Sequence, residues 1–146
     1  MSKIYHIIIF AILLLFFFAC SPTMQMGKIY TLEEANKLHG NVIYSVEINN
    51  NVVLELLKKT ENSIMFGLID RELVILDNHR NLIYPEKAEI RETDVFTAYS
   101  TDLVSELILN KESDKISVEQ RREVLSVSTQ SSTLESGSKC PPVCPD

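Results

Sequence analysis

An uninterrupted apolar run near the start of the chain limits how much of it can enter a folded domain. Residues Ile7–Ala19 are all apolar, Lys3 precedes them, and Cys20 stands where ordinary mixed sequence begins. A membrane-spanning helix needs about 20 apolar residues, so the run is short for a span. A basic start, an apolar centre and a small residue at the end are typical of an export signal. Removal of residues 1–19 leaves enough chain for one domain, and an uncleaved anchor helix is the alternative.

The residues around Cys20 add a second indication. The stretch Leu15-Phe16-Phe17-Phe18-Ala19-Cys20-Ser21 resembles the cleavage and lipidation site of bacterial lipoproteins. This resemblance implies a signal peptide at 1–19, followed by a tether at 20–27 whose Cys20 carries acyl chains such as palmitate. The mature protein would then sit in the cell envelope, attached to a membrane through its N-terminal lipid. Ser21 stands where an aspartate tends to retain such proteins at the inner membrane, which favours the outer membrane.

The charge balance argues against a nucleic-acid or anionic-lipid partner. The whole chain has 14 Lys and Arg against 20 Asp and Glu, a net charge of −6. Loss of Lys3 with the signal makes the mature chain one unit more negative. A nucleic-acid-binding protein usually carries a basic patch. The adjacent pairs Lys58-Lys59 and Arg121-Arg122 fit solvated helix faces better than a binding patch.

The first part of the mature chain predicts alternating strands and helices. Lys28-Ile29-Tyr30 predicts a short strand. Thr31-Leu32-Glu33-Glu34 has the pattern of a capping box, which predicts a helix from here to Leu38, and His39-Gly40 predicts its end. Residues Asn41–Ile48 predict a strand, and the apolar spacing in Asn51–Thr60 predicts a second amphipathic helix.

The middle of the chain has the pattern of an antiparallel meander. Three β-rich runs separated by short polar connections are followed by Pro85, which ends the ladder. A further strand is predicted at Val95–Tyr99, and a helix capped by Ser100-Thr101-Asp102 follows it. The three runs of the meander are Ser63–Asp70, Glu72–Asp77 and Asn81–Tyr84.

The sequence therefore predicts one α+β domain at 28–112, with a small, mostly antiparallel sheet and helices packed on one face. Residues 113–130 have a cap candidate and scattered apolar positions, mainly in Ser117–Thr129, which predict a further helix. The tail at 131–146 is rich in serine and proline and predicts disorder. We identify no internal repeat.

Two cysteines in this tail form its most unusual feature. Cys140 and Cys144 flank Pro141-Pro142-Val143. In an exported protein they would form a disulfide, and the alternatives are unpaired or interchain thiols and a soft-metal pair for copper(I). No cofactor is predicted. The histidines of the mature chain have ordinary explanations, His39 at a helix end and His79 in a turn. Three acids at strand ends could meet in space, although such residues usually serve turn chemistry: Asp70, Glu72 and Asp77.

These observations favour an interaction or accessory module of the cell envelope with an envelope protein as its partner. The sequence contains neither a Gly-x-Ser-x-Gly nor a His-Glu-x-x-His motif and no phosphate-binding loop, so nothing in it predicts an enzyme. The alternative is a thiol-redox or copper(I)-handling protein that works through Cys140 and Cys144.

Overall fold

The computed structural model describes residues 25–110, 113–141 and 144. The predicted signal peptide, Cys20 and most of the tether lie outside these residues. No helix in the described part of the chain is long and apolar enough to cross a membrane. The described residues form three helices, α2 (Leu32–His39), α3 (Asn50–Leu57) and α4 (Thr101–Leu109), and ten strands: β1 (Lys28–Thr31), β2 (Tyr44–Asn49), β3 (Ser63–Ile69), β4 (Glu72–Leu76), β5 (Leu82–Tyr84), β6 (Phe96–Ser100), β7 (Lys115–Gln120), β8 (Leu125–Ser128), β9 (Ser132–Glu135) and β10 (Ser138–Cys140).

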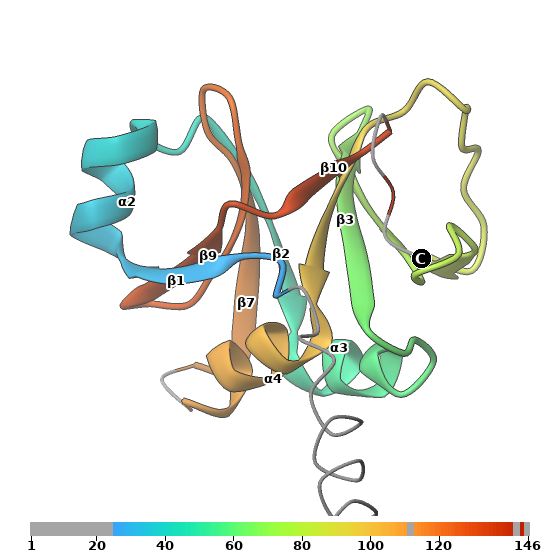
Figure 1. Ribbon diagram of the computed structural model, residues 1–146, viewed down its shortest axis with the longest axis horizontal. Helices are drawn as coiled ribbons and strands as arrows, with labels where there is room; N and C mark the ends of the chain where they lie inside the picture. The colour runs from blue at the N-terminus through green and yellow to red at the C-terminus, as the bar shows by residue number, and fades with distance from the viewer. Residues whose placement is uncertain (1–24, 111–112, 142–143, 145–146) are drawn as a thin grey trace, which may run out of the picture.

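The strands form two five-stranded sheets, in which every described pairing is antiparallel. Sheet A has the order β1-β9-β8-β7-β2, and sheet B has the order β10-β6-β3-β4-β5. The two sheets stand side by side, with α3 and α4 together at one end of the molecule and α2 outside sheet A (Figure 1). The α+β class and the antiparallel pairing predicted from sequence are confirmed. The single sheet with helices on one face is wrong, because the chain builds a second sheet.

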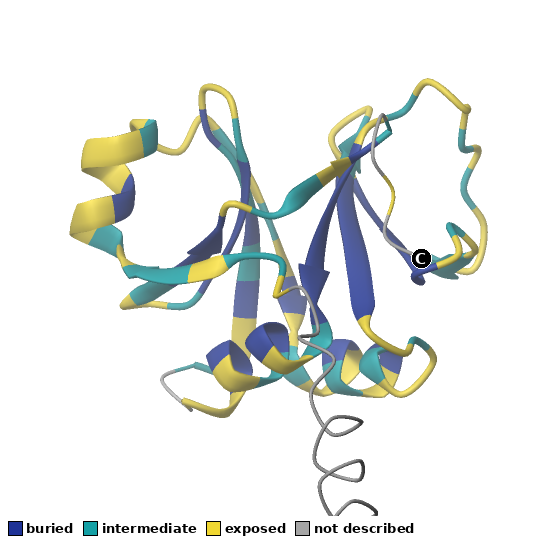
Figure 2. Ribbon diagram, viewed as in Figure 1, coloured by how far each residue is buried: buried dark blue, intermediate teal, exposed yellow. Residues whose placement is uncertain are grey.

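The main core lies between the inner faces of the two sheets. It combines Ile64, Phe66 and Tyr99 of sheet B with Val118 and Leu134 of sheet A. Figure 2 shows these strands as the most buried part of the molecule. Inward-facing residues alternate with outward-facing ones along each strand, so each sheet also has an outer face with its own cover.

The helices begin where the sequence predicts them. The capping box at α2 is present: Thr31 accepts a hydrogen bond from the Glu34 backbone N–H, and the Glu34 carboxylate accepts one from the Thr31 N–H. Gly40 follows α2 with a φ of 77°, which is easily reached without a side chain. At α4 the prediction of a side-chain cap is wrong. The Ser100 hydroxyl accepts a hydrogen bond from the backbone N–H of Met26 instead, at 2.7 Å.

The order of elements repeats along the chain. A strand, a helix and a three-stranded meander occur as β2-α3-β3-β4-β5 and again as β6-α4-β7-β8-β9. Identical residues recur 51 positions apart at Val53 and Val104 and at Leu56 and Leu107, and all four are buried. The expectation that the chain has no internal repeat is therefore wrong. The strands and turns between the matching residues differ enough in composition to hide the repeat.

The two repeats exchange their first strands. β2 pairs with β7 of the second meander, and β6 pairs with β3 of the first meander. Each sheet thus contains strands from both halves, and β1 and β10 complete them as added edge strands. Since each meander depends on a strand from the other half, the repeats make one cooperative domain.

The C-terminal part of the chain differs most from its prediction. In place of a helix in 113–130 the structure has β7 and β8, and in place of a disordered tail it has β9 and β10. Val118 of β7, Val127 of β8 and Leu134 of β9 face the core, and the residues on either side of each along the strand face outward. Gly137 allows the return to sheet B, because a Cβ there would lie 2.5 Å from the carbonyl oxygen of Ala98.

Candidate functional site

The outer faces of the two sheets differ in chemical character. On sheet B, buried apolar side chains form a second cluster that includes Met65, Val74 and Leu76. On sheet A, the buried outward-facing positions of β8 and β9 carry Ser126, Ser128, Thr133 and Glu135. Buried polar groups are costly unless they are paired. The polar outer face of sheet A is therefore the candidate for a functional site.

A buried ionic cluster occupies this face. Arg121 and Glu135 have side-chain exposures of 1% and 0%, and Arg121 Nε lies 3.1 Å from Glu135 Oε1. Another guanidinium nitrogen of Arg121 lies 3.0 Å from Glu119 Oε2. Ser126 donates a hydrogen bond to Glu135, and Ser128 donates one to Glu119, each at 2.8 Å. The prediction that Arg121 lies on a solvated helix face is wrong, since it is among the largest fully buried side chains.

The same arginine fixes helix α2 against the sheet. A terminal nitrogen of Arg121 donates to the side-chain oxygen of Asn36 at 2.6 Å and to the carbonyl oxygen of Gly40 at 2.7 Å. Ala35 is the buried residue of α2, so its apolar contact with the sheet is small. A hydrogen bond to a charged group contributes about 1.5–3 kcal/mol. Polar contacts to Arg121 therefore hold the helix in place.

His39 connects the buried cluster to the surface. Its Nε2 lies 3.0 Å from Glu135 Oε2, and its side chain is 26% exposed. The two atoms are close enough for an ion pair, but they do not form a hydrogen bond. The same is true of Arg121 Nε and Glu135 Oε1. The Ser126 hydroxyl donates to the same Glu135 carboxylate. His39 and Ser126 therefore both contact the Glu135 carboxylate. In a catalytic arrangement the serine would instead be hydrogen-bonded to the histidine that acts as its base.

A surface hollow of about 330 Å³ lies over this cluster, between the end of α2 and the turn after β7. Charges of both signs line it, from Lys37 and Arg122 on one hand and Glu123 on the other. This hollow belongs to the end of the molecule opposite α3 and α4 (Figure 1). Small-molecule pockets are lined mainly by apolar and aromatic side chains, whereas most side chains that line this hollow are polar or charged, which suits contact with charged groups of a protein.

Exposed apolar side chains occur in the segments that border the hollow, where the Ile43 N–H donates to the carbonyl oxygen of Gln120, just before the turn that carries Arg122 and Glu123. Leu38 lines it and is 60% exposed, and Ile43, three residues beyond Gly40, is 71% exposed. Val42 is exposed beside them. We call the surface made by residues 36–40, Val42, Ile43, Arg122 and Glu123 the distal surface. Apolar anchors surrounded by charged residues are the usual composition of a protein-binding patch.

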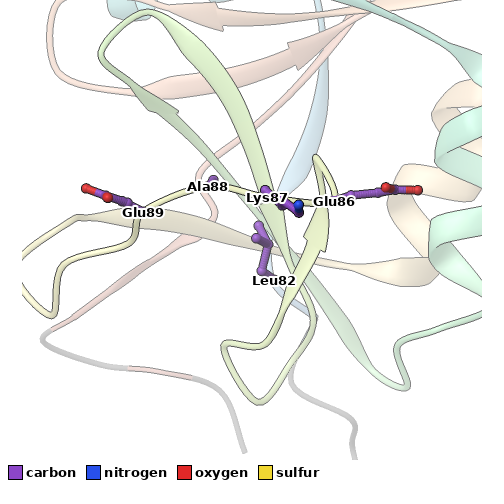
Figure 3. A pocket seen from close by; sticks show the side chains of 5 residues that line it. All are labelled: Leu82, Glu86, Lys87, Ala88 and Glu89. Carbon is purple, nitrogen blue, oxygen red and sulfur yellow. The ribbon is translucent and has the colours of Figure 1, made fainter.

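A second hollow, of about 530 Å³, lies on the other side of the molecule against sheet B. Leu82 and residues 86–89 line it. In Figure 3 the side chains of Glu86 and Glu89 extend in opposite directions, away from the hollow. Two diverging carboxylates cannot act on one substrate atom or hold one cation. This hollow is a space beneath an irregular loop, with no converging polar groups in the lining.

The structure joins Cys140 and Cys144 in a disulfide. Cys140 is the last residue of β10 and is fully buried, and Cys144 is exposed. Within residues 25–110, 113–141 and 144, no group of three or more His, Cys, Asp and Glu residues could hold a metal ion. In this disulfide form neither sulfur is a thiolate, and binding of copper(I) by the reduced pair stays a prediction.

The strand-end acids that the sequence suggested do not form a site. Glu72 begins β4 and Asp77 follows its end, so the two lie about 16 Å apart along an extended strand. The Asp77 carboxylate accepts hydrogen bonds from the backbone N–H groups of His79 and Asn81, each at 2.8 Å. Asp77 therefore shapes the turn before β5, and His79 lies exposed in that turn.

The functional features that sequence reasoning missed are Arg121, Glu119 and Glu135. The sequence signal that could have found them is the alternation of apolar and polar residues in the C-terminal strands. The polar residues, at every second position, predict one polar face of a sheet. In the comparisons with known proteins, no family model, curated protein or solved structure matches this chain.

Proposed function

We propose that this protein is a lipid-anchored module of the cell envelope that binds a partner protein through the distal surface. The observation that carries the proposal is the combination of exposed Leu38 and Ile43 with the charged hollow beside them. Solvent-exposed apolar side chains grouped at one end of a small domain are a typical sign of an interaction site.

The position of Met26 supports the orientation of this surface. The Met26 N–H donates to the Ser100 hydroxyl, and the Ser100 N–H donates to the Met26 carbonyl oxygen at 2.9 Å. Ser100 is the residue before α4. Residues 21–25 then extend at most about 18 Å from a lipidated Cys20, at about 3.3–3.6 Å per residue. With such a tether, the end formed by α3 and α4 faces the membrane and the distal surface faces away from it.

The proposal predicts that apolar residues of the distal surface are needed for binding and not for folding. In the variant Leu38→Ser with Ile43→Ser, we expect recovery of the partner from detergent-solubilised envelope to fall at least tenfold. The free energy of unfolding should change by less than about 1 kcal/mol, because both side chains are exposed. Quantitative pull-down and denaturant unfolding measure the two effects.

Val95→Ser provides the matched control, since Val95 is also a large exposed apolar residue at 52% exposure but lies outside the distal surface. It should leave partner recovery unchanged. A photo-crosslinker at position 43 should capture the same partner, and one at position 95 should not. Equal recovery by the double variant and the parent protein would reject the distal surface as the binding site.

A further inference from the structure

The tail disulfide has a chemical environment that its sequence spacing does not reveal. Its two sulfurs differ in access: Cys140 is buried at the end of β10, where it pairs with Phe96, and Cys144 is exposed. An external thiol approaching the disulfide therefore reaches Cys144 first. Access is one of the factors that decide which sulfur of a disulfide is attacked.

Arg80 lies against the buried sulfur. One of its terminal nitrogens is 3.2 Å from Cys140 Sγ and also 3.2 Å from the Cys140 carbonyl oxygen. The guanidinium lies over the ring of Phe96, 5.4 Å from its centroid, and its other terminal nitrogen is 3.5 Å from the Asp94 carbonyl oxygen. These contacts fix the cation beside the sulfur.

Within residues 25–110, 113–141 and 144, the contacts of the Arg80 guanidinium are all with uncharged groups. Among the described residues, no carboxylate lies within ion-pair distance of its guanidinium. Among these described groups, Cys140 Sγ is the one that can become an anion beside Arg80, as a thiolate. A nearby cation lowers the pKa of a thiol and stabilises its thiolate.

We propose that Cys140 and Cys144 form a thiol-exchangeable disulfide in which Cys144 is the attacked sulfur and Cys140 is the leaving group, stabilised by Arg80. The co-reactant is a small or protein-borne thiol. Its thiolate attacks Cys144 Sγ, a new mixed disulfide forms, and the bond to Cys140 breaks with its electron pair on Cys140 Sγ. A second thiolate then attacks the mixed disulfide. The external thiols leave joined as one disulfide, and the protein holds two reduced cysteines.

Exchange in this direction leaves the fold in place. Cys140 remains paired to Phe96 within sheet B, and the cleaved loop closes only three intervening residues. A loop this small adds little to stability on the entropy model, because the stabilisation grows with the length of the closed loop. The disulfide can therefore open and close while the domain stays folded, as a redox function requires.

The test uses the full mature protein and glutathione as the probe thiol. Partial reduction is stopped by an alkylating reagent, and peptide mass spectrometry locates the glutathione. We expect glutathione on Cys144 and the alkyl group on Cys140. In Arg80→Gln the rate constant for reduction should fall by about threefold to tenfold, because the leaving thiolate loses its cation. Arg80→Lys should retain most of the rate, and Lys115→Gln, in β7 of sheet A, is the control for loss of a distant positive charge.

A second readout separates stabilisation of the thiolate from a merely structural role of Arg80. In Cys144→Ser, which leaves Cys140 as a single thiol, the pH dependence of alkylation gives the pKa of Cys140. Arg80→Gln in this background should raise that pKa by about one unit. Glutathione located on Cys140, or an unchanged pKa and reduction rate in Arg80→Gln, would overturn the proposal. Neither result bears on the distal surface, which is tested by partner recovery.

Discussion

The outer faces of sheets A and B occupy equivalent places in the two repeats, but different kinds of side chain are buried on them. On sheet B, apolar residues such as Leu76 pack beneath an irregular loop, an arrangement that tolerates changes in the cover. On sheet A, Arg121 joins Glu119 and Glu135 to helix α2. Ionic partners must meet at defined distances and angles, so this face depends on one geometry. The comparison shows that equivalent positions can carry either a hydrophobic or an ionic layer.

The largest effect is expected from breaking the ionic layer. Arg121→Met leaves the buried Glu135 carboxylate and the partly buried Glu119 carboxylate without the guanidinium, and it removes the hydrogen bonds that hold α2. Removing one partner of a buried ion pair costs about 3–5 kcal/mol. We expect the free energy of unfolding, measured by urea denaturation, to fall by this amount, and amide exchange in α2 to become faster.

The triple variant Glu119→Leu, Arg121→Met, Glu135→Leu sharpens this result. It makes the outer face of sheet A apolar, like that of sheet B, and it leaves no uncompensated charge at the three positions. Apolar replacement of a whole buried ionic group is often neutral or stabilising by about 1–4 kcal/mol. The triple variant should therefore be more stable than Arg121→Met. If it is equally unstable, the ionic layer is not the reason for the loss in the single variant.

An intermediate effect is expected on sheet B. Leu76 is fully buried in the outer cluster, and Leu76→Ala removes apolar contacts and leaves a cavity. Such changes cost about 2–5 kcal/mol. Because the loop above can settle into the space, we expect a value near the lower end in urea denaturation. Amide exchange in α2 should not change, and a faster exchange there would contradict the separation of the two faces.

The smallest effect concerns Tyr99, a core residue of sheet B close to the ionic layer. Burial, together with the charge of Glu135, raises the pKa of Tyr99 above its ordinary value of 10.0. The neutral phenol is therefore favoured in the folded state. Its contribution to stability is present below pH 10 and is lost as the pH rises above it, because the unfolded state ionises first.

Denaturation at a series of pH values from 8 to 11 measures this loss. Tyr99→Phe, which cannot ionise, should show a shallower decline between pH 10 and 11 than the parent protein. It also loses the hydrogen bond from the Tyr99 hydroxyl to the Leu125 carbonyl oxygen, so its stability at pH 8 is the reference for its own series. Parallel curves for the two proteins would show that Tyr99 does not contribute to the pH dependence.

Much of the first half of the chain could be predicted from the sequence because its signals are local. The capping box at Thr31 and the helix ending at Gly40 depend on residues within a few positions, and the structure confirms both. The meander in 63–84 was predicted from short polar connections between β-rich runs, and β3, β4 and β5 confirm it.

The strand and helix that begin the second repeat were predicted and are present as β6 and α4, whereas its meander and the tail were predicted poorly because their strands have a mixed character. In β7 and β8 apolar residues such as Val118 and Val127 face the core, and the residues that alternate with them are Lys, Ser and Glu, which weakens the β signal. The composition of the tail suggested disorder, but Leu134 and Cys140 supply buried anchors within it. The ionic site required contacts between Arg121, Glu135 and Asn36, residues far apart in the sequence, and no local pattern brings them together.

Because the two repeats exchange their first strands, the chain has the arrangement of a domain-swapped dimer whose two subunits are joined in one polypeptide. A single unit of strand, helix and meander would have an unpaired meander edge and a first strand with no partner of its own, and two such units would satisfy each other. The stretch 85–95 serves as the covalent link between them. A peptide made of one unit alone should therefore gain stable structure only by pairing with a second unit, and the linked chain achieves this pairing at any protein concentration.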